Sequence, residues 1–269
     1  MKEWLVNLNK LCDAPWKSRK VCSQKGQDGI LENIFENIGT KNTPPFCVEF
    51  GFNHREFIGG SGANVANLVL NKGWACLLFD GSYENKKINL HKHHLTSDNI
   101  CGLFKKYEVP HEPDYISIDV DSTDLWLFKA VLGKYKPRVV SVEYNSHFPF
   151  DSAITFPNNP IERYQGDRGY GASLKALKLV GEEYGYSIVA VEEKLDVFFI
   201  RNDLIDDGTD EIAPDFENWK KFTELVGHIP LRRRERAGIF IDYEEYRKTN
   251  GDLEKDCPIN FEPIQSSCY

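Results

Sequence analysis

Acidic and amide side chains follow several short apolar runs of this sequence, close to the point where each run ends. They are Glu49 and Asn53, on either side of Gly51; Asp80; Asp119 and Asp121; and Glu143 and Asn145. Ionised carboxylates are costly to bury unless they meet a ligand, a metal or hydrogen-bond donors. Ligands of open α/β sheets bind outside the carboxyl ends of the strands, so we expect these residues to form one polar site.

Specific roles are available to three of these residues. Gly51 allows the backbone to turn tightly where a ligand must come close. Glu49 could pair with an amino group of the ligand or orient the loop that follows. Asp80 is placed to accept hydrogen bonds from both hydroxyls of a ribose, or else to cap the turn that starts at Gly81. The glycine-rich stretch at 59–62 does not match G-x-G-x-x-G, which disfavours NAD and ATP.

The elements that must position this site are predicted from hydrophobic periodicity. Apolar runs that predict strands lie at 46–50, 74–79, 115–120 and 138–144, with a short third strand at 93–95. Helical patterns lie at 26–38, 63–72, 99–107, 125–132 and 173–183. Buried strands separated by helices predict a mostly parallel sheet with helices on both faces.

The last two apolar runs, 186–191 and 196–200, are separated only by a tight turn. They must therefore form an antiparallel hairpin. Such a hairpin at the end of the sheet distinguishes class I methyltransferases from dinucleotide dehydrogenases. The expected fold is thus α/β and Rossmann-like, as in class I methyltransferases: a seven-stranded, mostly parallel sheet with a C-terminal antiparallel hairpin.

Three regions are expected along the 269 residues. Residues 1–36 form an N-terminal helical segment, 37–205 the Rossmann-like domain, and 206–269 a polar appendage.

The net charge of −8 disfavours a nucleic-acid partner, and the basic cluster at 232–236 is interpreted as a solvated helix face. None of the seven cysteines forms a C-x-x-C pair, which disfavours zinc. With no apolar run near 18 residues and no signal peptide, we expect a cytoplasmic protein without a membrane span.

Several segments, through their order and spacing, resemble the FkbM-like methyltransferases. They are Ser23-Gln24-Lys25-Gly26-Gln27-Asp28-Gly29-Ile30, Phe46 to Gly51, Asn64-Val65-Ala66-Asn67-Leu68, Ile116 to Asp121 with Asp124, Val142-Glu143-Tyr144-Asn145, Tyr170 to Leu174 and Phe199 to Asp203. The likeness covers roughly residues 20 to 205. The chain departs from the family pattern at Ser122, where glycine is common, and in an insertion at 54–57.

This resemblance implies a class I enzyme that uses S-adenosylmethionine, commonly to methylate a hydroxyl of a sugar or a polyketide-type compound. It implies that Glu49, Gly51, Asp80 and Asp119 line the cofactor, and Asn53 is added to them from its place after the first strand. It also implies that Gln24 and Gln27 close over the cofactor and that Asn99 and Ile100 lie beside its adenine.

A hydroxyl acceptor must lose its proton, so a base is expected near the transferred methyl group. The candidates are Asp121, Glu143 and His147. Two hypotheses remain open: Asp121, Glu143 and Asn145 could hold Mg²⁺ or Mn²⁺, or Asp121 or His147 could act without a metal. Because alternate strand residues share a face, Asp119 should point the same way as Asp121, and Glu143 the same way as Asn145. The histidines at 91–94 are interpreted as structural.

The expected partner is a carbohydrate or another hydroxyl-bearing small molecule. Aromatic and amide residues of the irregular segment 146–172 would recognise it: Phe148, Phe150, Phe156, Asn158, Asn159, Tyr164 and Tyr170. Alternative functions are a methyltransferase of a small natural product, lipid or protein, and a non-catalytic interaction protein on the same fold. An NAD-dependent oxidoreductase is disfavoured by the missing glycine pattern and by the terminal hairpin.

Overall fold

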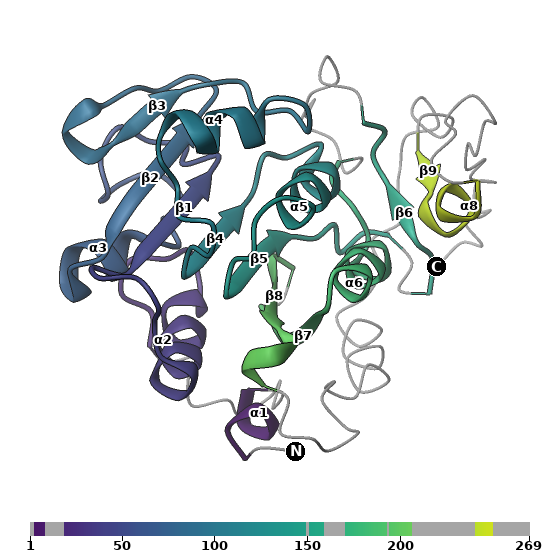
Figure 1. The fold of residues 1–269 in the computed structure, drawn as a ribbon, viewed down its shortest axis with the longest axis horizontal. Coiled ribbons are helices and arrows are strands. Elements are labelled where there is room, and N and C mark those ends of the chain that lie inside the picture. The colour runs from purple at the N-terminus through teal and green to yellow at the C-terminus, as the bar shows by residue number, and fades with distance from the viewer. Residues whose placement is uncertain are drawn as a thin grey trace, which may run out of the picture.

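Seven strands pair into one sheet in the order β3-β2-β1-β4-β5-β8-β7 (Figure 1). The computed structural model describes residues 3–8, 19–148, 151–158, 170–192, 194–205 and 240–249. The strands of the sheet are β1 (Phe46–Phe50), β2 (Ala75–Asp80), β3 (Leu90–Lys92), β4 (Tyr115–Ile118), β5 (Val139–Glu143), β7 (Tyr186–Val191) and β8 (Asp196–Arg201). The first five are mutually parallel, and β8 runs antiparallel to both β5 and β7. This confirms a Rossmann-like, mostly parallel sheet with a terminal hairpin.

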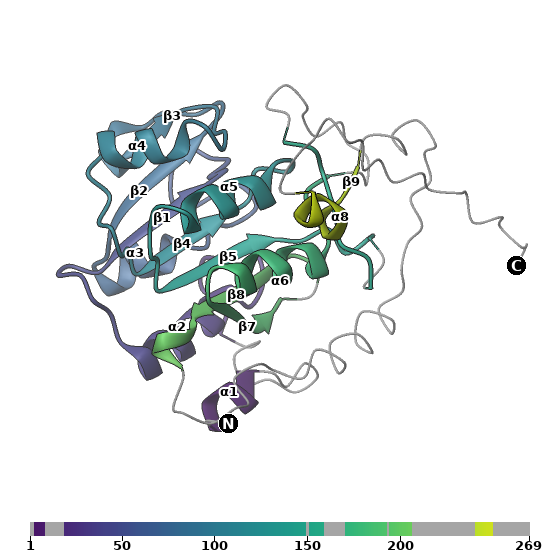
Figure 2. The same ribbon diagram turned by 45° about the vertical axis from the view of Figure 1, so that its right-hand side comes forward.

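Helices cover both faces of the sheet, as expected (Figures 1 and 2). The helices α1 (Glu3–Leu8), α2 (Gln27–Ile38) and α3 (Ala66–Lys72) pack on one face. On the other face lie α4 (Ile100–Lys106), α5 (Asp124–Leu132) and α6 (Leu174–Glu183). Alternation along β1 divides the core between them, because Cys47 packs with the first group and Val48 and Phe50 with the second. Short 3-10 turns, η2 (Lys86–Ile88) and η3 (Asn202–Leu204), follow β2 and β8.

The third strand lies earlier in the chain than predicted. Leu90 to Lys92 pair with Leu78 to Asp80 and form β3, whereas the prediction at 93–95 was wrong. The register gives the reason. Lys92 already faces Asp80, the last residue of β2, so the residues at 93–95 run beyond the edge of the sheet and have no strand to pair with.

Residues near the C-terminus return to the body of the fold. A two-stranded antiparallel sheet joins β6 (Ile154–Thr155) to β9 (Ile241–Asp242), and α8 (Tyr243–Lys248) follows (Figure 1). The Tyr243 N–H donates to the Ala153 carbonyl, and the Tyr246 ring packs edge-on against Trp126 of α5. This part of the predicted polar appendage therefore packs beside α5 and α6; its remainder, with the basic cluster at 232–236, lies outside the described residues.

None of the described helices is long and apolar enough to cross a membrane.

β1 leaves the sheet at Gly51, where two segments of backbone come unusually close. Gly51 has a φ of 70°, and a Cβ added there would lie 1.7 Å from the carbonyl oxygen of Asp119. Gly73, at the end of α3, has almost the same φ of 71°, but a Cβ there would meet nothing within 4 Å. Both glycines therefore have a positive φ, but only Gly51 is crowded by another segment of backbone.

Replacing Gly51 with alanine should therefore destabilise the fold far more than the matched change at Gly73. Both variants carry the strain of a positive φ, roughly 1 kcal/mol. Only Gly51→Ala also forces the backbone at Asp119 to move, so we expect a loss of about 3 kcal/mol or more in the free energy of unfolding. Urea denaturation followed by circular dichroism measures both values, and equal losses would contradict the close approach at Asp119.

Candidate functional site

A cavity of about 350 Å³ opens at the carboxyl ends of β1, β2 and β4. This is the edge of the sheet where open α/β folds bind their ligands. Among its lining residues are Gln24, Gln27, Glu49, Gly51, Asn53, Asp80 and Asp119, all predicted to contact the cofactor. The lining also includes Ser61, Gly62, Asn64, Phe79, Gly81, Ser82, His93, His94, Leu95, Val120, Asp121, Ser122, Leu195 and Asp196. The structure thus gathers most of the predicted site at one place.

Glu49 points from β1 toward α3 and anchors the loop between them. Its Oε1 accepts a hydrogen bond from the Asn64 N–H at 3.0 Å, and its Oε2 accepts one from the Val65 N–H at 3.1 Å. Burial raises the pKa of Glu49 to about 7, although these two hydrogen bonds act to lower it. Of the two roles predicted for Glu49, these hydrogen bonds support that of orienting the loop. The side chain also lines the cavity.

Asp80 caps the turn after β2, the alternative considered for it. Its Oδ1 accepts hydrogen bonds from the N–H groups of Ser82 and Tyr83, and its Oδ2 accepts one from the Asn53 N–H at 2.8 Å. The side chain is 8% exposed and lines the cavity. Because a carboxylate oxygen can accept more than one hydrogen bond, the turn cap leaves the predicted ribose contact available.

The segment before α2 is folded over the cavity by one carboxylate. The Oδ2 atom of Asp28 accepts hydrogen bonds from the N–H groups of Val21, Cys22 and Ser23 and from the Ser23 hydroxyl, at 2.7–2.8 Å. The same segment reaches the start of β8, since Gln27 Nε2 donates to Asp196 Oδ2 at 3.0 Å. These contacts place Gln24 and Gln27 against the cavity, where they were predicted.

Asp196 and Asn64 are buried polar residues of the site that the sequence reasoning missed. Asn64 Nδ2 donates to Asp196 Oδ2 and to the Ser117 hydroxyl, at 3.2 and 3.0 Å. A signal for Asp196 existed in the predicted hairpin. An antiparallel strand beside the parallel ones begins at the edge where they end, and Asp196 accordingly pairs with Glu143, the last residue of β5.

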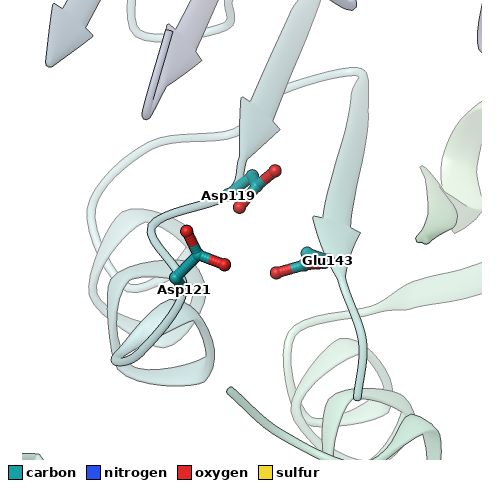
Figure 3. A group of neighbouring side chains, drawn as sticks. All are labelled: Asp119, Asp121 and Glu143. Atoms are coloured by element: carbon teal, nitrogen blue, oxygen red, sulfur yellow. The ribbon is translucent and has the colours of Figure 1, made fainter. Parts of the chain in front are cut away.

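Three carboxylates, those of Asp119, Asp121 and Glu143, point toward one another (Figure 3). Each offers an oxygen within 4.8 Å of the others. Burial, followed by the charge of Asp119, raises the pKa of Glu143 to about 12, and burial with the charge of Asp121 raises that of Asp119 well above its usual value. Strand alternation is not what pairs the two aspartates. β4 ends at Ile118, and a turn with a φ of 58° at Asp121 brings them together.

The neighbouring Asp124 has a structural role. Its Oδ1 accepts a hydrogen bond from the Val120 N–H at 2.7 Å and its Oδ2 one from the Ser122 N–H at 2.9 Å. Burial raises the pKa of Asp124 to about 7. These two hydrogen bonds fold the chain between β4 and α5, and so they hold Asp121 in place.

Several predicted residues lie elsewhere. Asn145, proposed as a metal ligand, donates through Nδ2 to the Tyr170 carbonyl, and its Oδ1 accepts from the His147 N–H. Half-buried His147 does not line the cavity. Neither do the proposed adenine contacts: Asn99 Nδ2 donates to the His94 carbonyl, and Ile100 is fully buried in the core. The residues at 93–95, which precede them in the chain, line the cavity.

The aromatic residues expected to contact the acceptor are only partly described. Phe148 and Phe156 are buried in a small cluster with Ile154 and Phe240, and neither lines the cavity. Asn158 accepts a hydrogen bond from the Ser97 hydroxyl, and half-buried Tyr170 binds Asn145 through its carbonyl. Phe150, Asn159 and Tyr164 lie outside the described residues.

Comparison with known proteins adds no relative: no protein-family model matches the chain, and no curated protein does. The resemblance to FkbM-like methyltransferases stays a prediction from the segments quoted above.

The raised pKa of Glu49 predicts a pH dependence of stability. Because the folded-state pKa of about 7 exceeds the ordinary 4.5, the folded chain holds a proton that the unfolded chain releases. The stability from this group is complete below about pH 4.5 and is lost as the pH rises to 7. Relative to Glu49→Gln, the wild type should lose of order 3 kcal/mol over that interval in denaturation experiments. Parallel pH profiles would contradict this, and exposed Glu36→Gln is the control.

Removing Asp28 should release the segment that covers the cavity. Asp28→Ala leaves four donors without their acceptor, so we expect a loss of about 2–4 kcal/mol in stability and faster hydrogen exchange at residues 21–23. Glu32→Ala is the matched control on α2, since it removes the same charge from surface ion pairs with Arg19 and Lys72, worth under about 1 kcal/mol. Unchanged exchange in Asp28→Ala would show that other contacts hold the segment.

Proposed function

We propose that this chain is an S-adenosylmethionine-dependent O-methyltransferase of the FkbM-like type, acting on a hydroxyl of a sugar or related small acceptor. The observation that carries the proposal is the acid-lined cavity at the carboxyl ends of β1, β2 and β4, in a sheet that ends in an antiparallel hairpin. Four of the seven segments that resemble the FkbM-like family, those at 23–30, 46–51, 64–68 and 116–121, contribute residues to the lining of this cavity.

The charge of the cavity favours this cofactor over nucleotides. Five carboxylates line it: Glu49, Asp80, Asp119, Asp121 and Asp196. The lining contains no lysine or arginine, and its basic residues are His93 and His94. Phosphate groups would be repelled there, whereas S-adenosylmethionine carries a sulfonium and an ammonium group that acidic surroundings attract. The same argument disfavours NAD and ATP.

Most of the predicted binding residues line the cavity. Gly51 lines the cavity where β1 passes the backbone of Asp119, and Asp80 lines it at the end of β2, where it could accept hydrogen bonds from a ribose. Glu49 holds the β1–α3 loop in shape, and the segment fixed by Asp28 presents Gln24 and Gln27. The adenine end is assigned to the wall formed by residues 93–95 instead of Asn99 and Ile100.

When bound, S-adenosylmethionine supplies a methyl group attached to a positively charged sulfur. The acceptor oxygen forms a bond to that methyl carbon as the carbon–sulfur bond breaks, and the hydroxyl proton passes to a base. Alignment of the two partners supplies much of the acceleration. Among the predicted bases, Asp121 lines the cavity, and its pKa is raised by burial, which makes it a better proton acceptor than an ordinary aspartate. We assign the base role to Asp121 over His147.

Calorimetric titration with S-adenosylhomocysteine tests the cofactor assignment. The wild type should bind it with micromolar affinity, and Asp80→Ala should weaken binding at least tenfold through loss of the ribose contact. Because Asp80 also caps a turn, each variant is first checked for an unchanged melting temperature, and Asp80→Asn, which keeps one acceptor oxygen, should lose less.

Glu84→Ala provides the matched control, since Glu84 is an exposed acid four residues away and does not line the cavity. Its affinity should equal that of the wild type. A flat titration of the wild type, with and without Mg²⁺ or Mn²⁺, would refute the methyltransferase proposal and favour a non-catalytic interaction protein.

A further inference from the structure

Two kinds of carboxylate occur at this edge of the sheet. Glu49, Asp80 and Asp124 each accept hydrogen bonds from backbone N–H groups. In the described part of the chain, no such hydrogen bond reaches Asp119, Asp121 or Glu143, and none of the ion pairs includes them. These three residues therefore lack the compensation that their neighbours have.

The lack of hydrogen-bond donors is clearest at Glu143. Its Oε2 atom is buried and has no hydrogen-bond partner among the described residues. The side chain comes from the end of β5 and points at the two aspartates after β4 (Figure 3). A buried carboxylate oxygen without a donor is destabilising, so a ligand that satisfies it would stabilise the site.

The spacing of the three carboxylates is that of ligands on one ion. Two oxygens bound to the same Mg²⁺, Mn²⁺ or Ca²⁺ at roughly 2.0–2.4 Å can be at most about 4.8 Å apart. The oxygens of Asp119, Asp121 and Glu143 lie within 4.8 Å of one another. Hard divalent cations prefer such oxygen donors, and an ion there would replace mutual repulsion with attraction.

We infer that Asp119, Asp121 and Glu143 together bind one divalent cation, and that the acceptor of the reaction binds this ion through two adjacent oxygen atoms. The ligand set differs from the predicted one, because Asp119 takes the place of Asn145, whose amide is committed to Tyr170 and His147. Mg²⁺ and Mn²⁺ commonly take six ligands, so three carboxylates leave positions open toward the cavity that Asp119 and Asp121 line.

The nature of the acceptor follows from those open positions and rests on the proposed function. A vicinal diol, a catechol or an α-hydroxy acid could occupy two of them, whereas an isolated hydroxyl could occupy only one. The cation would lower the pKa of a bound hydroxyl. Asp121 would then act as a metal ligand in place of the base role assigned above, the proton of the bound hydroxyl would pass to solvent, and the open position would decide which hydroxyl is methylated.

Manganese binding to the full-length, chelator-treated protein tests the cation site without any cofactor. Electron paramagnetic resonance and calorimetry should show one Mn²⁺ per chain, and Asp121→Asn and Glu143→Gln should each weaken binding at least tenfold. Asp98→Asn is the matched control, since Asp98 is exposed and lies outside the cluster. Saturating Mn²⁺ should raise the melting temperature of the wild type and of Asp98→Asn but of neither cluster variant, and a cooperative melting transition without Mn²⁺ shows that those variants are folded.

Absence of Mn²⁺ and Mg²⁺ binding to the wild type, or equal affinity in all variants, would overturn the cation site and leave the carboxylates sharing protons. The acceptor class is tested with tropolone, a bidentate oxygen ligand, against phenol. Tropolone should displace water from the bound Mn²⁺, measured by proton relaxation, and phenol should not; equal effects would overturn the paired-oxygen acceptor. Titration with S-adenosylhomocysteine is independent of both results, so failure of the methyltransferase proposal is distinguishable from failure of the cation site.

Discussion

A carboxylate removed from bulk water needs donors or a cation, and this requirement organises one end of the molecule. Hydrogen bonds to Asp28 hold the segment before α2, and those to Glu49 hold the β1–α3 loop. In the same way, Asp80 holds the turn after β2 and Asp124 holds the turn after β4. In each case one acid accepts hydrogen bonds from backbone N–H groups that would otherwise lie unpaired at the end of a strand or helix. The acids are therefore what fixes the loops, and the loops are what form the cavity.

The same requirement distinguishes the carboxylates that hold loops in place from those that are candidates for ligand binding. Asp119, Asp121 and Glu143 belong to the same edge of the sheet, yet the described chain provides them with no N–H donor and no cationic partner. A fold that satisfies both carboxylate oxygens of Glu49, Asp80 and Asp124 could have satisfied these as well. The contrast supports a role in binding, because carboxylates without hydrogen-bond donors or cationic partners attract a positively charged ligand. A sulfonium cofactor and a divalent cation both fit that description, and they could occupy adjacent parts of one site.

Packing around β5 supports the wall of this site. Residues 240–249 return to pair with β6 and to cover α5, while Asn145 ties the end of β5 to the chain at Tyr170. Two of the aromatic residues predicted to recognise a carbohydrate take part in this packing, because Phe148 and Phe156 are buried with Phe240. On the proposed function, specificity for the acceptor would then depend more on oxygen ligands at the cavity than on aromatic faces, which is consistent with a site lined by five acids.

The sequence alone determined the sheet, because long apolar runs, helical periodicity and the short gap before Asp196 leave few other arrangements, and most of the cavity's lining followed from the ends of those runs. It misplaced β3, since only pairing with β2 shows where that strand must stop. The tertiary structure decided the uses of individual side chains. The turn at Asp121 brings it to Asp119, antiparallel pairing brings Asp196 to Glu143, and Asn145 is committed to the loop at Tyr170. Periodicity predicts where a residue lies along a strand, but hydrogen bonds with distant segments decide what its side chain is free to bind.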